Sequence, residues 1–265
     1  MSDLNPVLLE ISPDGVAMVI LNRPERKNAF DETMIEALSE VFETLRVSET
    51  VRIVFVKGAG TTFCAGADLA WMQRQARHDI AENQADAMAL ASMLNRLHSL
   101  PQFTVALVQG GAFGGGAGLI AACDYAVAID GAKFCFSEVR LGLTPATISP
   151  YVIEAIGPRQ ARALFATAMP FDARRAFEFG LVQELAVDLN DLSKREERLA
   201  DLAFTAAPGA VEASKQLVRD MVGQPIDGAL MHETARRIAT RRASDEGREG
   251  LAAFLEKRTP NWAPK

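Results

Sequence analysis

Apolar residues follow two different periods along the first half of the chain. Consecutive apolar runs rich in valine, isoleucine and phenylalanine, each followed by turn residues, predict buried strands. These runs cover residues 16–21, 51–57, 103–109, 125–129 and 133–136. Between them, apolar residues recur at intervals of three and four over residues 31–46 and 80–97, which predicts amphipathic helices, the first with Asp31 as its N-cap. The alternation of the two periods predicts an α/β fold.

The pattern changes near residue 192. Beyond it the strand-like runs stop, and helical spacing recurs in four stretches, residues 194–206, 211–221, 226–241 and 246–257. We therefore expect an α/β core over residues 1–191 and a helical C-terminal region over residues 192–265.

Composition narrows the class of protein. The 265 residues are 49% hydrophobic and 23% charged, which is enough for a large core. A net charge of -6 argues against a nucleic-acid surface, since phosphate binding depends on clustered lysine and arginine. The basic cluster Arg236, Arg237, Arg241 and Arg242 has acidic neighbours, which predicts a helix with internal ion pairs or a subunit contact. No apolar stretch reaches the roughly 20 residues that a membrane-spanning helix needs. The first residues lack a secretion signal, so we expect a cytoplasmic location.

Cysteines and histidines form no metal-binding pattern. Cys64, Cys123 and Cys135 make neither a CxxC pair nor an even disulfide set, and the three histidines are scattered. Cys64 stands beside a glycine-containing loop, where it could act as a nucleophile, but no acid or histidine lies at a diagnostic spacing. The sequence favours a buried structural thiol.

Two glycine-containing loops carry the candidate chemistry. They span residues 63–69 and 110–118, and each follows a strand-like run. Such loops can present backbone N–H groups to one acyl oxygen from two directions. The consecutive glycines Gly114, Gly115 and Gly116 are entropically costly unless the backbone must approach something closely, which favours a binding role.

Residues 116–121 also fit the dinucleotide-binding pattern GxGxxA. The match comes late in the chain, and Asp124 and Asp130 follow too soon for the acid that binds a ribose. Glu138 has the spacing but follows a predicted hairpin. An NAD-dependent dehydrogenase is therefore kept as an alternative that predicts stabilisation by NAD, whereas no phosphate-binding P-loop motif is present.

Five ordered motifs resemble one known family. They are Asn22-Arg23-Pro24 with Asn28-Ala29, residues 63–69, residues 110–118 with Cys123-Asp124, Phe136-Ser137-Glu138 with Gly142, and residues 244–247 continuing to 253–258. Across essentially its whole length the chain resembles the enoyl-CoA hydratase/isomerase (crotonase) family. The resemblance implies a spiral of ββα turns with a C-terminal helical trimerisation region, and commonly a homohexamer. It also implies an acyl-CoA thioester as substrate, with no cofactor besides the coenzyme A that the substrate carries.

By this resemblance, the N–H groups of Ala67 and Gly115 form an oxyanion hole and Glu138 is the catalytic acid or base. Proton transfer beside a thioester carbonyl builds enolate charge on its oxygen, and one preorganised donor supplies roughly 3 to 4 kcal/mol. The residues that the resemblance assigns to binding of the substrate and its CoA are Arg26, Ala29, Ala65, Asp68, Leu69 and Gly114. For Arg26 and Lys27, a phosphate contact and a solvated turn remain equal alternatives.

The chain departs from the family pattern at Gly118. Hydratases of this family usually carry a first glutamate there and a second one twenty residues later, where Glu138 is retained. Glu138 could instead be an ion-pair partner of Arg140, two residues on along the same predicted strand. Residues 65–72, 137–143 and 145–150 resemble bacterial methylglutaconyl-CoA and carboxygeranoyl-type hydratases. Three hypotheses follow: a hydratase, an isomerase that moves the double bond from C3 to C2 with one carboxylate, and a non-catalytic acyl-CoA-binding subunit.

Overall fold

Four of the five strand-like runs of the sequence pair in one central sheet, together with two strands that the sequence analysis did not predict. The computed structural model describes residues 5–263, and its large sheet has the order β1-β2-β3-β4-β6-β9. These strands span Val7–Ile11 (β1), Val16–Leu21 (β2), Ile53–Gly58 (β3), Phe103–Val108 (β4), Tyr125–Ile129 (β6) and Glu184–Ala186 (β9). β1 and β2 form an antiparallel hairpin, and every later pair is parallel. The α/β prediction is confirmed.

A second, smaller sheet carries the backbone that leads into the candidate site. It consists of β5 (Gly111–Phe113), β7 (Lys133–Cys135) and β8 (Phe171–Asp172), with β7 in the centre. β5 and β7 are parallel, and an isolated bridge between Cys64 and Ala112 extends the pairing to the first glycine loop. The sequence predicts β7 but misses β5 and β8, because strands of two or three residues are too short to show alternation.

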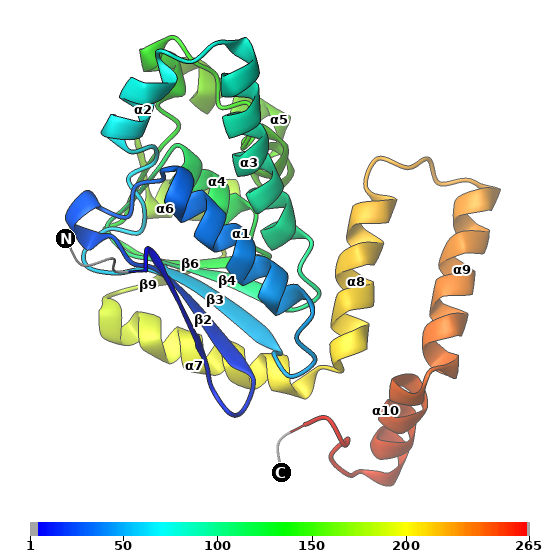
Figure 1. The fold of residues 1–265 in the computed structure, drawn as a ribbon. Coiled ribbons are helices and arrows are strands. Elements are labelled where there is room, and N and C mark those ends of the chain that lie inside the picture. Colours follow the sequence, from blue (N-terminus) through cyan, green and yellow to red (C-terminus); the bar gives the residue numbers. More distant parts are fainter. Residues whose placement is uncertain (1–4, 264–265) are drawn as a thin grey trace.

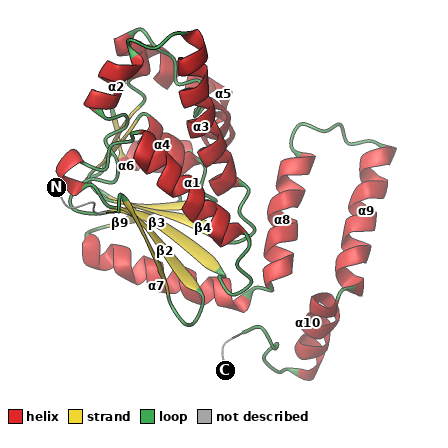
Figure 2. Ribbon diagram, viewed as in Figure 1, coloured by secondary structure: helices red, strands yellow, loops and turns green. Residues whose placement is uncertain are grey.

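The two faces of the large sheet are buried under different helices (Figure 2). Alternate residues of a strand point to opposite faces. Val54 and Val56 of β3 therefore pack in one cluster with α1 (Glu32–Arg46) and α3 (Ile80–His98). Ile53 and Phe55 face the other way, against α7 (Leu189–Thr205). As predicted, Asp31 caps α1, and its carboxylate accepts a hydrogen bond from the N–H of Met34.

Further helices lie between the strands. They are η1 (Pro24–Arg26), α2 (Leu69–Gln75), α4 (Gly115–Ala121), η2 (Glu138–Leu141), α5 (Ser149–Thr167) and α6 (Ala173–Phe179), of which η1 and η2 are 3-10 helices. The second glycine loop lies at the start of α4, and Glu138 opens η2. Glu138 was expected on the strand that precedes it; that prediction is wrong, because the backbone turns at Ser137 and winds into η2 until Gly142 ends it in the left-handed region.

The last three helices leave the body of the molecule (Figure 1). They are α8 (Pro208–Met221), α9 (Gly228–Ala243) and α10 (Asp245–Glu256), and we call residues 206–263 the arm. Helix α7 still packs on the sheet, so the chain departs from the core at Ala206; the boundary expected after residue 191 stays a prediction. The arginines Arg236, Arg237 and Arg241 form the predicted ion pairs, with Glu233, Asp220 and Glu246.

The arm buries little of its own apolar surface. Helices α8 and α9 have no buried residue, and α10 buries only Ala253 among the residues that the structure describes. Phe254 is 80% exposed and Leu255 is 77% exposed. None of the helices within residues 5–263 is long and apolar enough to cross a lipid bilayer.

Candidate active site

The two glycine loops lie against each other. Cys64 donates its N–H to the carbonyl of Gly111 at 3.1 Å, and Phe113 donates its N–H to the carbonyl of Cys64 at 3.0 Å. Gly66 adopts a φ of +90°, and a Cβ there would lie 2.9 Å from the carbonyl oxygen of Phe113. A glycine is required at this crossing. The structure therefore brings the segment after Gly66 next to the segment after Phe113.

Two backbone donors at this crossing have no partner. Phe30 pairs with both neighbours of Ala67, because its N–H donates to Gly66 and its carbonyl accepts from Asp68, each at 2.7 Å. The N–H of Ala67 itself donates to no atom of the described residues. Gly115 is the first residue of α4, so its N–H lies outside the helical ladder, and it too has no acceptor within residues 5–263. Ala67 is exposed and Gly115 is half-buried.

Gly114 connects these donors to the carboxylate of Glu138. Its N–H donates to the carbonyl of Cys135 at 2.9 Å, and its φ of +48° with ψ of -118° is a backbone conformation that side chains rarely allow. A Cβ on Gly114 would lie 3.2 Å from Oε1 of Glu138. The carboxylate thus sits directly over the residue that precedes the free N–H of Gly115.

Glu138 is a partly buried acid without an ion-pair partner in the described part of the chain. Its Oε2 is fully buried and accepts no hydrogen bond from any residue in that part. Burial raises the pKa of this carboxyl above its usual value, as expected for a charge that is removed from water. Arg140 instead donates to the carbonyl of Ala168 at 2.7 Å. The interpretation of Glu138 as an ion-pair partner of Arg140 is therefore wrong.

The other glycines of the second loop are explained by close packing. A Cβ on Gly116 would lie 2.7 Å from Cβ of Cys64, and one on Gly118 would lie 2.2 Å from Cγ2 of Ile148. Neither glycine faces open space, so close packing is enough to explain both. Burial raises the pKa of the Cys64 thiol to about 12, so it is an inert structural thiol.

The residues expected to bind the substrate and its CoA surround the first loop. Asp68 is buried, caps α2 through the N–H groups of Ala70 and Trp71, and lies 3.5 Å from Arg23 and 3.8 Å from Arg26. The side chain of Arg26 is half-exposed, and that of Leu69 is 76% exposed. Ala29 is buried and Ala65 is half-buried. Asp68 is therefore engaged by its own chain, while much of the side-chain surface of Arg26 and Leu69 is exposed.

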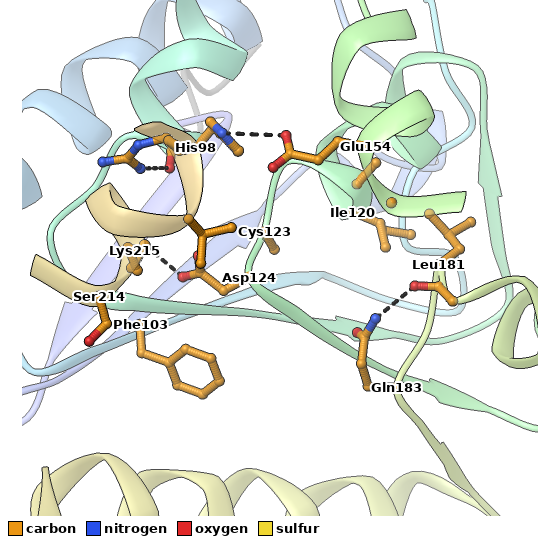
Figure 3. A pocket seen from close by; sticks show the side chains of 15 residues that line it. His98, Phe103, Ile120, Cys123, Asp124, Glu154, Leu181, Gln183, Ser214 and Lys215 are labelled. Carbon is orange, nitrogen blue, oxygen red and sulfur yellow. Dashed lines mark hydrogen bonds and ion pairs between the residues drawn. The ribbon is translucent and has the colours of Figure 1, made fainter. Parts of the chain in front are cut away.

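A separate cavity of about 440 Å³ lies where the arm meets the core (Figure 3). Lys215 of α8 reaches into it and donates to Asp124 and to the carbonyl of Gln102, both at 2.6 Å. His98 lies 3.7 Å from Glu154, and burial lowers the pKa of its imidazole. Figure 3 shows His98 paired with Glu154 and Lys215 paired with Asp124, and apolar side chains such as Ile120 also line the cavity. The cavity does not include Glu138 or the glycine loops.

Sequence reasoning missed Ile148 and Lys215. Ile148 belongs to residues 145–150, a segment noted for its resemblance, but its contact with Gly118 spans thirty residues and no local pattern shows it. No group of three or more histidine, cysteine, aspartate or glutamate residues within the described chain is arranged to hold a metal ion.

Comparisons with known proteins give one consistent result. The sequence profile described as enoyl-CoA hydratase/isomerase matches residues 12–265. The short-chain-enoyl-CoA hydratase of Clostridium acetobutylicum is 30% identical over 97% of this chain and 97% of its own length. The crotonyl-CoA hydratase of Syntrophomonas wolfei is 29% identical over 98% of both. The crystal structure of an enoyl-CoA hydratase from Shewanella pealeana superimposes with a TM-score of 0.94 at 41% identity, covering 98% of this chain and 97% of that one.

Proposed function

Because this chain belongs to the enoyl-CoA hydratase/isomerase family, we propose that it is an enoyl-CoA hydratase, which adds water across the α,β double bond of an acyl-CoA thioester. One observation carries the proposal: the Glu138 carboxylate lies over Gly114, next to a backbone N–H that has no acceptor in the described chain. A proton donor or acceptor and an oxyanion donor at one place are what this reaction needs.

The N–H groups of Ala67 and Gly115 are proposed to hold the thioester oxygen. As the oxygen of water bonds to C3, electrons move toward the thioester oxygen and an enolate forms. Donors that are already in place stabilise that charge without reorganising, and each is worth roughly 3 to 4 kcal/mol. The packing of Gly66 against Phe113 holds the two donors in position before substrate arrives.

Glu138 is proposed to move the one proton that the reaction transfers, from water to C2. Its ionised carboxylate takes a proton from the water whose oxygen bonds to C3, and the resulting carboxylic acid gives that proton to C2 of the enolate. Its partly buried position supports this dual role, because a raised pKa brings the acid and base forms closer in free energy near neutral pH. No group beyond the substrate's own coenzyme A is required.

The half-exposed Arg26 is proposed to contact a phosphate of coenzyme A. Leu69, which begins α2 and is 76% exposed, is proposed to pack against the CoA moiety, with the backbone of Ala29, Ala65 and Asp68 beside it. Gly114, which lies directly under the Glu138 carboxylate, is proposed to contact the acyl group through its backbone. The apolar surface of the arm supports assembly into a homotrimer or homohexamer.

One observation favours an enoyl-CoA isomerase as the second candidate. Position 118 has no side chain and Ile148 fills the adjacent space, so Glu138 has no second carboxylate beside it there. An isomerase needs only one carboxylate, which removes a proton from C2 of a 3-enoyl thioester and returns it to C4.

The test is to incubate the protein with crotonyl-CoA, 3-methylglutaconyl-CoA and a 3-enoyl-CoA, following the absorbance of the conjugated thioester and the product mass. Loss of absorbance with the gain of one water supports the hydratase and ranks the acyl chains. A rise in absorbance at unchanged mass with the 3-enoyl substrate supports the isomerase instead. Thermal stabilisation by these thioesters without turnover would leave the non-catalytic binding subunit.

A further inference from the structure

Helices α4 and α5 meet through one unusually close contact. A Cβ on Gly118 would lie 2.2 Å from Cγ2 and 2.6 Å from Cβ of Ile148, distances that real atoms do not adopt. Ile148 is 1% exposed and stands at the N-terminus of α5. Its side chain therefore fills a notch in α4 that exists only because residue 118 is a glycine.

The notch lies within one helical turn of the candidate site. Gly118 is three residues beyond Gly115, the first residue of α4. Glu138 lies over Gly114, and Ile148 lies over Gly118. The contact with Ile148 thus acts on the helix whose first residue carries the free N–H of Gly115.

We propose that Ile148 is a positioning residue, which fixes the place of the Gly115 N–H by locking α4 against α5 through Gly118. This inference rests on the proposed function, because it takes that N–H to be the donor to the thioester oxygen. The same contact leaves no space for any side chain at position 118.

A helix of seven residues is held by its packing and hardly by its own hydrogen-bond ladder. A displacement of α4 by about an ångström would move the Gly115 N–H out of line with the thioester oxygen, and misplacements of that size cost about 100-fold in rate. We therefore expect a change in the packing at Gly118 to change kcat.

The first variant is Gly118→Ala, which places one methyl group against Ile148. We expect kcat to fall about 10- to 100-fold, with KM changed less than about threefold, because coenzyme A binds elsewhere. The matched control is Gly131→Ala, where a Cβ would meet nothing within 4 Å, and it should keep the wild-type kcat.

The second step repeats Gly118→Ala in two other backgrounds. Ile148→Ala removes Cγ2 but leaves Cβ at 2.6 Å, whereas Ile148→Gly leaves nothing closer than Cα at 3.7 Å. Glycine is accepted at the N-cap, where Ile148 stands. The loss of kcat caused by Gly118→Ala should shrink from wild type to Ile148→Ala to Ile148→Gly. Equal losses in all three backgrounds would overturn the proposal, since contacting residues must be coupled.

An infrared measurement separates this inference from the proposed function. Butyryl-CoA cannot be hydrated, and its thioester carbonyl stretch moves to lower frequency when N–H donors polarise it. We expect a shift on binding to wild type that is reduced in Gly118→Ala and restored in Gly118→Ala with Ile148→Gly. No binding or no shift in wild type would refute the proposed oxyanion donors. A full shift in wild type that persists in Gly118→Ala would refute only the role of Ile148.

Discussion

The glycine loops and the arm leave opposite kinds of groups without partners. At the loops, space is filled so closely that a methyl group has no room on Gly66, Gly116 or Gly118, yet two N–H groups and a carboxylate oxygen find no partner in the described chain. In the arm, arginines and acids are paired, yet large apolar side chains such as Phe254 are exposed to solvent.

This difference indicates two different kinds of partner. Polar atoms without partners in a rigid, packed surrounding suit a small ligand that brings its own polar atoms. Apolar side chains on three successive helices suit another protein surface, because only a large partner can remove that much area from water. We therefore expect chemistry at the glycine loops and assembly at the arm.

The largest effect is expected from Glu138→Gln. Glutamine keeps the size of the side chain but neither accepts nor donates a transferable proton, so turnover should fall about 10²- to 10⁴-fold. Steady-state kinetics on whichever of the three assayed thioesters the wild type turns over measures this, and thermal shift with butyryl-CoA checks that binding is retained. Turnover equal to wild type would end the assignment of Glu138.

The stability of Glu138→Gln provides its control. Because burial raises the folded-state pKa of Glu138, its carboxyl weakens folding as pH rises from the ordinary 4.5 through that raised value, and the penalty persists above it. Glu138→Gln should therefore melt slightly above wild type at pH 7 and equal to it at pH 4. A lower Tm at both values would indicate that the variant damages the fold.

The second largest effect is expected from Gly114→Ala. A Cβ there would lie 3.2 Å from Oε1 of Glu138 and would strain a φ of +48°, so both the acid and the neighbouring N–H should move. We expect kcat to fall about 100-fold. Gly223→Ala in the arm is the matched control, since its φ of +76° is also strained but a Cβ meets nothing within 4 Å. Equal losses in both variants would contradict a special role for the loop.

The features predicted from the sequence depend on residues that are close together in the chain. Those found only in the structure depend on contacts between residues that are far apart in the chain. Asp31 was predicted as a cap, because capping involves residues three apart in sequence. The segments around Ala67, Gly115 and Glu138 were recognised from residue type and order. The strand predicted at Glu138 is not formed. Residues 138–141 form a 3-10 helix that ends at Gly142 in the left-handed region, and strand propensity does not describe such turns. Contacts between distant segments, as at Ile148, need coordinates.

The variant Phe254→Glu tests whether the arm mediates self-association. Burying a phenylalanine contributes about 1.5 to 3 kcal/mol, so a charge in its place should weaken self-association about 10- to 100-fold. Light scattering after size exclusion, over a dilution series, measures the change. Val187→Glu is the control, because Val187 is also 80% exposed but lies outside the arm. A wild-type chain that is monomeric at all concentrations would contradict the interpretation of the arm.

The smallest effect is expected where the two regions join, at Lys215. Its side chain is 11% exposed and gives hydrogen bonds to Asp124 and to the Gln102 carbonyl, so Lys215→Met leaves both acceptors one donor short. We expect a loss of about 1 to 3 kcal/mol in unfolding free energy, seen as a Tm lower by roughly 3 to 10 °C at fixed protein concentration. The exposed Lys194→Met should change neither stability nor kinetics. If Lys215→Met lowers kcat while Tm stays unchanged, the contacts of Lys215 between the arm and the core must act on the glycine loops. Chemistry and assembly would then not be separate in this chain.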